Sequence, residues 1–150
     1  MRSDSITARR FALDSNCLIA LLCAWHAHHE RTTAAYDHLR KARRKCVLPV
    51  PAWLEAFSVI TRLPAPYRVD AATARSALNG VLDNAVLVPV SATAARSAVD
   101  AVTACGAAGG RVYDALIACS AHEAGAEILL TWNVKHFKEI LPQGLSVAEP

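Results

Sequence analysis

The sequence is poor in several features that mark particular protein classes. Its five cysteines are odd in number and include no C-x-x-C pair, so neither a zinc site nor a disulfide framework is indicated. No apolar run approaches the roughly 20 residues that span a bilayer. Charged residues make up only 19% of the 150-residue chain, against 53% hydrophobic residues, which excludes a disordered chain. We therefore expect a cytoplasmic protein with one folded domain over residues 1–150, in which residues 1–9 form a loose tail.

Motifs of several common enzyme classes are also missing. The chain contains neither a Walker loop nor the G-x-G-x-x-G fingerprint, which argues against a nucleotide-dependent enzyme. His122 and Glu123 begin an H-E-x-x-H motif, but Ala126 stands where the second histidine is required. The H-x-H-H cluster at residues 26–29 has no acid or cysteine at helical spacing to complete a tetrahedral metal shell. The candidate chemistry therefore lies elsewhere in the chain.

Short apolar runs alternate along the chain with stretches of helical length. Strands are predicted for residues 11–13, 46–48, 86–88, 128–130 and 145–147. Helices are predicted for residues 17–25, 32–43, 52–62, 71–82, 92–105, 112–124 and 133–140, with a polar loop at 26–31. Asp70 and Ser91 are the expected N-caps, and Gly125 is expected to end a helix. This alternation is typical of a doubly wound α/β protein with three α/β/α layers. The middle layer is a short parallel sheet of four to five strands.

Four polar residues stand out, because ligands of parallel sheets bind beyond the carboxyl ends of the strands. Asp14 directly follows the first predicted strand, and Asn133 lies three residues after the fourth. Glu55 and Asp114 are lone acids near the starts of two very apolar helices. Each residue also has a simpler interpretation. Asp14 and Asn133 are suited to capping a helix, and a carboxylate in a first turn gains roughly 0.3–1 kcal/mol from the helix dipole.

The four residues gain significance when they are taken together. Three carboxylates aimed at one crevice would repel one another unless a cation neutralised them. A set of oxygen ligands selects Mg²⁺ or Mn²⁺ over zinc. Magnesium held by a few carboxylates characteristically engages phosphates and lowers the pKa of an attacking water. The pattern therefore favours a metal site that hydrolyses phosphodiester bonds.

Four segments resemble the motifs of PIN-domain ribonucleases, specifically the VapC-type toxins of bacterial toxin–antitoxin pairs. They are LDSN at 13–16, PAWLE at 51–55, YDALIA at 113–118 and LTWN at 130–133, the last followed by HF at 136–137. The resemblance covers nearly the whole chain. It implies that Asp14, Glu55 and Asp114 are acidic metal ligands and that Asn133 occupies the fourth catalytic position, where many members carry Asp. An amide supplies an oxygen but no charge, so the resemblance leaves open whether one or two metal ions bind.

The same resemblance implies an endoribonuclease that depends on Mg²⁺ or Mn²⁺. Water would attack the phosphorus in line and leave 5′-phosphate and 3′-hydroxyl ends. The expected partners are an RNA substrate, a VapB-like antitoxin and a second copy of the chain in a homodimer, with no membrane. Ser15, Asn16, Arg111 and Thr131 are expected to support the site. Arg111 would contact phosphate or the antitoxin, whereas Ser15 and Thr131 either hold a metal-bound water or cap a helix.

Other interpretations stay open at the level of sequence. A PIN-like fold also suits a non-catalytic RNA-binding or assembly module, because fold does not fix function. A metal phosphatase or a nuclease that acts on DNA is a third interpretation. The net charge of +3 permits a polyanionic partner without requiring one, and the basic run at residues 40–45 is either a solvated helix end or an RNA phosphate contact. Trp25, Trp53 and Trp132 are expected in the core or an interface, and stacking on a base is expected only for a tryptophan near the site, such as Trp132.

Overall fold

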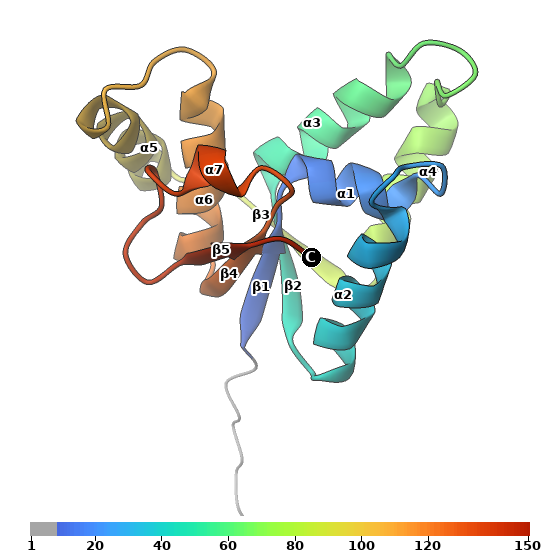
Figure 1. Cartoon of the computed structure of the whole chain (residues 1–150), viewed down its shortest axis with the longest axis horizontal. Coiled ribbons are helices and arrows are strands. Elements are labelled where there is room, and N and C mark those ends of the chain that lie inside the picture. The colour runs from blue at the N-terminus through green and yellow to red at the C-terminus, as the bar shows by residue number, and fades with distance from the viewer. Residues whose placement is uncertain (1–8) are drawn as a thin grey trace, which may run out of the picture.

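The computed structural model, which describes residues 9–150, is organised around a parallel sheet of five strands (Figure 1). The strand order is β3-β2-β1-β4-β5. The strands are β1 (Arg10–Leu13), β2 (Lys45–Pro49), β3 (Ala85–Val88), β4 (Ala126–Leu130) and β5 (Ser146–Ala148). These observations confirm the α/β class, the parallel sheet and the five predicted strands. The expected loose tail falls outside the described residues except for Arg9.

Helices cover both faces of this sheet and form the outer two layers. They are α1 (Ser15–Leu22), α2 (His29–Lys41), α3 (Val50–Thr61), α4 (Ala71–Val81), α5 (Ala92–Ala104), α6 (Arg111–Glu123) and α7 (Val134–Phe137). In Figure 1, α5 and α6 lie on one side of the strands and α1 and α2 on the other. The three-layer arrangement agrees with the sequence-based prediction.

The layers are held by strand side chains that alternate between the two faces of the sheet. Ala12, Val47 and Leu129 belong to the cluster that faces α5 and α6, whereas their neighbours Phe11 and Leu13 belong to the cluster that faces α1 and α2. Each of these side chains is at most 1% exposed. Because both faces are covered, the strands are apolar runs rather than alternating ones, which explains why they were recognisable in the sequence.

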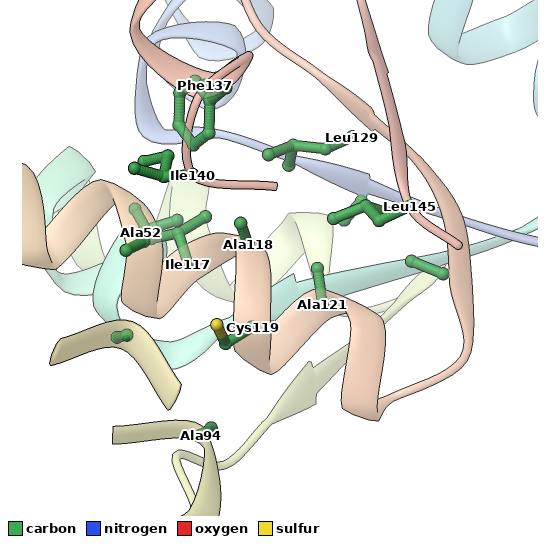
Figure 2. Packing of buried hydrophobic residues seen from close by; sticks show 14 of the residues in the cluster. Ala52, Ala94, Ile117, Ala118, Cys119, Ala121, Leu129, Phe137, Ile140 and Leu145 are labelled. Carbon is green, nitrogen blue, oxygen red and sulfur yellow. The ribbon is translucent and has the colours of Figure 1, made fainter. Parts of the chain in front are cut away.

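Small side chains let α6 approach the sheet closely. Ala118 and Ala121 are fully buried on the side of α6 that packs toward the strands, and Figure 2 shows them beside Leu129 and Leu145. The larger Phe137, from α7, packs against the same cluster near the amino end of α6. This packing fixes the position of α6, and α6 carries one of the candidate acids.

The predicted helix boundaries were right at the Asp70 and Ser91 caps, and wrong in the first helical hairpin and at α7, which ends at Phe137 instead of residue 140. Asp70 and Ser91 accept hydrogen bonds from the backbone of the third helical residue of α4 and α5, over 3.0 and 2.9 Å, as N-caps do. α1 ends at Leu22, although the apolar run predicted a helix as far as residue 25. Cys23 is extended and buried against α3 and α4, so it contributes to the core without being helical.

The loop expected at residues 26–31 is also shorter than predicted, because α2 begins at His29. The Nδ1 atom of His29 lies 2.8 Å from the carbonyl oxygen of Ala20, and this contact links α2 to α1. Glu30 supplies a negative charge in the first turn, where the helix dipole favours it. The helix therefore begins three residues before its predicted start at residue 32.

Two further observations concern the helices and the cysteines of the part of the chain that the structure describes. No helix within residues 9–150 is long and apolar enough to cross a bilayer. All five cysteines are free thiols, as the absence of paired spacings predicted. Burial raises the pKa of Cys46 to about 12 and also raises the pKa of Cys23 and Cys119, so these thiols stay protonated at neutral pH.

Candidate active site

The candidate site lies where the strand order changes direction. The chain adds β2 and β3 on one side of β1, and then β4 and β5 on the other. The segments that leave β1 and β4 therefore diverge at the carboxyl edge of the sheet, which is where parallel α/β sheets bind ligands. A hydrogen bond of 3.0 Å from the Asp14 N–H to the Leu130 carbonyl holds the ends of these two strands together.

Asp14 is buried at this point, with only 3% of its surface exposed. The Ser15 N–H donates to Oδ1 over 2.7 Å, and the Thr131 hydroxyl donates to Oδ2 over 2.9 Å. Burial raises the pKa of Asp14 to about 6, although the hydrogen bonds from Thr131 and Ser15 lower it, and the charges of Asp114 and Glu55 raise it further. Oδ2 thus has one donor and retains a lone pair for a cation, whereas Oδ1 accepts from the N–H of Ser15 and, over 3.5 Å, from its hydroxyl.

Glu55 and Asp114 face each other across a neighbouring open pocket. Pro51 and Glu55 of α3 and Tyr113 and Asp114 of α6, together with Gly110, line this pocket of about 400 Å³. Burial raises the pKa of Asp114, the charge of Glu55 raises it further, and His136 and Arg111 oppose both effects. The charges of Glu55 and Asp114 both act on the Asp14 carboxyl, and the charge of Glu55 acts on Asp114, so the three predicted acids lie within electrostatic reach of one another.

The structure also tests the simpler interpretations of the acids. Asp14 is indeed the N-cap of α1, and it satisfies the first helical N–H. Asp114 lies in the first turn of α6. Glu55 does not lie in a first turn, because α3 begins at Val50 and no acid occupies its first turn. The helix dipole therefore gives no account of Glu55, which is an exposed carboxylate directed to the pocket it shares with Asp114.

The donor set fits a hard divalent cation. The three acids offer only oxygen ligands, and each electrostatic contact among them is unfavourable while they are ionised. Within residues 9–150 no three side chains of His, Cys, Asp or Glu stand as close together as the ligands of a metal held by protein atoms alone. Mg²⁺ keeps several of its waters and usually takes one or two carboxylates directly, so a looser set of acids suits it better than a closed cage.

Asn133, the fourth predicted ligand, is exposed at the rim of the site. It occupies the N-cap position of α7, but its side chain caps no N–H of that helix. Its backbone N–H donates to the Thr131 hydroxyl over 3.0 Å. The same hydroxyl donates to Asp14, so the segment that carries Asn133 is tied to the buried carboxylate through Thr131. The Asn133 amide is therefore near the site, without a side-chain hydrogen bond to the three acids.

The supporting residues hold the site together in different ways. The Asn16 Oδ1 accepts the Trp132 N–H over 3.2 Å and so links α1 to the segment after β4. The Ser15 hydroxyl is buried 3.5 Å from the Asp14 Oδ1. Arg111 donates from Nη2 to the His136 carbonyl over 2.7 Å, which joins α6 to α7 beside Asp114. Its Nε is buried without a hydrogen-bond partner among the described residues.

Sequence reasoning did not find the surroundings of Trp132. The His28 ring stacks on the Trp132 ring with centroids 3.8 Å apart and planes at 11°, and the Arg31 guanidinium lies 4.9 Å from the ring centroid. The indole N–H donates to the Thr32 hydroxyl over 3.0 Å. The start of α2 thus clamps the segment that positions Thr131. No local signal connects residues 28–32 with 132, because their proximity arises only from the tertiary fold.

Known proteins share this sequence pattern and fold. The family model described as PIN domain matches residues 11–140. Ribonuclease VapC40 of Mycobacterium tuberculosis (strain ATCC 25618 / H37Rv) is 31% identical over 118 residues, which are 79% of this chain and 83% of that protein.

Solved structures have the same fold at low sequence identity. VapBC2 from Rickettsia felis, in a complex with a DNA fragment from its promoter, matches with a TM-score of 0.70 and 19% identity, over 93% of this chain and 98% of that one. VapC20 of Mycobacterium tuberculosis, described as a sarcin-ricin loop cleaving toxin, matches with a TM-score of 0.63 and 14% identity, over 79% of this chain and 86% of that one. At these identities the structural matches speak for the fold alone.

Proposed function

Because the chain belongs to the PIN domain family, we propose that it is a metal-dependent endoribonuclease and the toxin of a toxin–antitoxin pair. The similarity to a VapC ribonuclease supports RNA cleavage by this chain. The observation that carries the proposal is that Glu55 and Asp114 line one pocket and that their charges act on the buried Asp14 carboxyl at the switch point of the sheet. A purely structural role leaves this grouping of repelling carboxylates unexplained.

In this proposal Asp14, Glu55 and Asp114 hold Mg²⁺ or Mn²⁺, and the Asn133 amide supplies a further oxygen. When bound, the cation neutralises charge on the scissile phosphate and lowers the pKa of an attacking water. The Thr131 hydroxyl and the Ser15 N–H keep the Asp14 carboxylate in place. Water attacks the phosphorus, the bond from phosphorus to the 3′-oxygen breaks, and the products carry 5′-phosphate and 3′-hydroxyl ends.

A protein partner and a homodimer form part of the proposal. Leu54 and Tyr113 are 54% and 63% exposed, and they directly precede the site acids Glu55 and Asp114. Large apolar side chains around a polar cleft favour coverage by another chain. The solved relatives include toxin–antitoxin complexes, which supports a VapB-like antitoxin as the covering chain. The free thiols agree with a reducing cytoplasm as the place of action.

The partner proposal is tested by light scattering after gel filtration at micromolar concentration. We expect the isolated chain to run as a homodimer, and co-expressed antitoxin to co-purify with it and to suppress RNA cleavage. Replacement of Tyr113 by Glu should weaken one of these two associations. A monomeric chain that is tolerated at high expression without any partner would contradict both parts.

The catalytic proposal is tested by incubating the pure protein with pools of RNA and of single-stranded DNA. We expect RNA cleavage with Mg²⁺ or Mn²⁺ and none with EDTA. Asp114→Asn should lower the cleavage rate by at least about 100-fold, since it removes charge from the centre that stabilises the transition state. Asp100→Asn is the matched control, because Asp100 is an exposed acid on α5. Cleavage in excess EDTA, or full activity of Asp114→Asn, would contradict the metal mechanism.

The same experiment separates the two rival interpretations. A non-catalytic module would bind RNA in every buffer and cleave none of it. A phosphatase or DNA nuclease would leave the RNA intact and release phosphate or DNA fragments.

A further inference from the structure

A second feature of this molecule lies at the edge opposite the acids. Seven of the 16 Lys and Arg residues gather at the amino ends of β1 and β2. They are Arg9, Arg10, Arg40, Lys41, Arg43, Arg44 and Lys45, and we call them the amino-edge basic surface. Arg10 and Lys45 are register partners on neighbouring strands, and Figure 1 shows the turn from α2 to β2 at the same end of the molecule as the start of β1. All except the half-buried Arg44 are exposed.

Little of this charge is neutralised within the chain. Arg9 and Arg44 each stand 3.8 Å from the half-exposed carboxylate of Glu127. Arg10 donates to the Ala124 carbonyl and Arg40 donates to the Asn84 amide oxygen, and these neutral acceptors leave both charges in place. The remaining three residues make no ion pair or side-chain hydrogen bond with the part of the chain that the structure describes. They are Lys41, Arg43 and Lys45.

The needs of the fold account for only part of the surface. Arg40 and Lys41 interact favourably with the carboxyl end of α2. Arg10 and Lys45, by contrast, place like charges side by side on adjacent strands. Arg43 has a φ of 60°, in the left-handed region where glycine or asparagine is favoured and a long side chain is uncommon. The sequence thus keeps cations at three positions, 10, 43 and 45, where these features of the fold would favour other residues.

The chemistry that matches several exposed cations in a row is a chain of phosphates. The strands between the two edges have four or five residues, so the basic surface lies about 15 Å from the acids along the sheet. We propose that the amino-edge basic surface binds the phosphodiester backbone of the RNA substrate outside the cleavage site. This inference rests on the proposed ribonuclease function, because that function supplies the RNA. The binding energy for the RNA backbone then comes from the edge of the sheet opposite the cleavage site.

Binding is measured by fluorescence anisotropy with a labelled RNA of about 30 nucleotides, a stacked length of about 100 Å, in EDTA. The test variant combines Lys41→Gln, Arg43→Gln and Lys45→Gln. The control variant combines Arg62→Gln, Arg75→Gln and Arg96→Gln, which remove the same charge from exposed positions elsewhere. Thermal melts establish that both variants fold, and if the test variant melts early the double variant Lys41→Gln with Lys45→Gln replaces it.

The test variant should bind this RNA at least about tenfold more weakly than the control variant. Its slope of log K against log salt should be smaller than that of the wild type by about 2, the value for three lost phosphate contacts on a single strand. Equal binding by the wild type and the test variant would overturn the proposal. Equal losses in the two variants would also overturn it, because net charge alone would then explain the effect.

Cleavage kinetics test whether the phosphates that bind this surface belong to the RNA substrate or to another nucleic acid such as duplex DNA. With the long RNA, the test variant should have a higher KM and an unchanged kcat. With an RNA of about four nucleotides, a stacked length of about 10 Å, it should match the wild type, since so short a strand does not reach the basic surface. If the test variant lost binding to duplex DNA but kept the KM of the wild type for long RNA, the assignment of this surface to the RNA substrate would be overturned. If the wild type cleaves no RNA, the ribonuclease function fails, and the anisotropy result still decides whether this surface binds nucleic acid.

Discussion

Asp14 is both a helix cap and the most deeply buried acid of the candidate site. The hydrogen bonds that its carboxylate accepts do not compensate for its burial, because the pKa is still raised to about 6. The ionised form is therefore the costly one in the metal-free protein. A cation that binds beside the carboxylate would relieve that cost, which is why burial here favours a metal ligand over a simple cap.

The raised pKa of Asp14 predicts a pH dependence of stability. The folded protein holds this proton up to about pH 6, whereas the unfolded chain releases it near the ordinary pKa of 3.8, so the folded state binds more protons between these values. Stability from this group is therefore present at low pH and is lost as pH rises through about 6. In EDTA, the wild type should gain about 1 kcal/mol relative to Asp14→Asn between about pH 7.5 and 5.5.

Urea unfolding of both proteins at the two pH values measures this difference, and comparing the variant with the wild type cancels the titration of the histidines. An identical pH response of the wild type and Asp14→Asn would show that the Asp14 carboxyl is not perturbed.

Asp114 distinguishes repulsion within a site from stabilisation of a helix. If the acids converge, Asp114→Asn relieves repulsion from Glu55, so the metal-free protein should be as stable as the wild type or more stable, while RNA cleavage is lost. If Asp114 only balances the dipole of α6, the substitution should cost up to about 1 kcal/mol and leave cleavage intact. Thermal melts in EDTA, paired with a cleavage assay, measure both quantities on one protein.

Asn133→Asp is the reverse change at the rim of the site. It adds a negative charge near the other acids, so the metal-free protein should lose a few tenths of a kcal/mol, a small amount because position 133 is exposed. The affinity for Mn²⁺ should rise, since the metal gains a charged ligand. Calorimetric titration with Mn²⁺ measures the affinity, and Asn84→Asp, at an exposed position far from the acids, is the control. Unchanged Mn²⁺ affinity in Asn133→Asp would remove residue 133 from the ligand set.

At the scale of the elements, the strands and most helices were predictable because their signals are local. Three or four consecutive apolar residues marked each of β1 to β4, and Asp70, Ser91 and Gly125 marked helix ends. The end of α1 and the start of α2 were not predictable in this way. Cys23 leaves the helix because its side chain is buried against α3 and α4, and this contact involves residues more than 30 positions away.

The candidate site also contains features that the sequence predicted and contacts that it did not. Asp14 and Asp114 were found because each is a polar residue in an apolar setting, and the pocket shared by Glu55 and Asp114 follows from the α/β topology. The contacts that hold the segment after β4 were missed. They join Trp132 to His28, Arg31 and Thr32, and a sequence pattern carries no record of such stacking.

The clamp on Trp132 predicts a coupling between α2 and the metal site. Trp132→Leu removes the stacking and the indole hydrogen bond, so the segment that carries Thr131 should open more readily and hold Asp14 less well. We expect faster hydrogen exchange at the Thr131 and Asn133 amides and a smaller rise of Tm on addition of Mn²⁺. Trp25→Leu is the matched control, because Trp25 packs against Tyr67. Equal metal-induced shifts in the two variants would show that the clamp does not reach the site.

At the scale of the whole molecule, the charges are divided between the two edges of the sheet. The candidate acids gather at the carboxyl edge, and the amino-edge basic surface holds seven cations with one acidic ion-pair partner. An acidic centre repels a polyanionic substrate, so a nuclease of this kind needs cations that attract the substrate as well as the metal that accepts its phosphate. The fold places these two tasks on opposite ends of the same short strands.

A single domain is predicted to unfold as one unit. The cluster that includes Ala12, Val47 and Leu129 and the cluster that includes Phe11 and Leu13 share the same central strands, so neither layer of helices keeps its core without the sheet. Calorimetry in EDTA should therefore show one transition whose calorimetric and van't Hoff enthalpies agree. Two separable transitions would contradict a single domain.

We propose that Asp14, Glu55 and Asp114 bind one catalytic metal centre. The most direct test of this proposal is the shift of Tm on addition of Mg²⁺ or Mn²⁺ to the wild type, to Asp14→Asn, Glu55→Gln and Asp114→Asn, and to the control Asp100→Asn. At a hundredfold excess of metal over Kd, binding adds about 2.7 kcal/mol, which raises Tm by roughly 5–10 °C in the wild type and the control. Each of the three site variants should show a clearly smaller rise. Identical shifts in all five proteins would show that these acids do not share a metal.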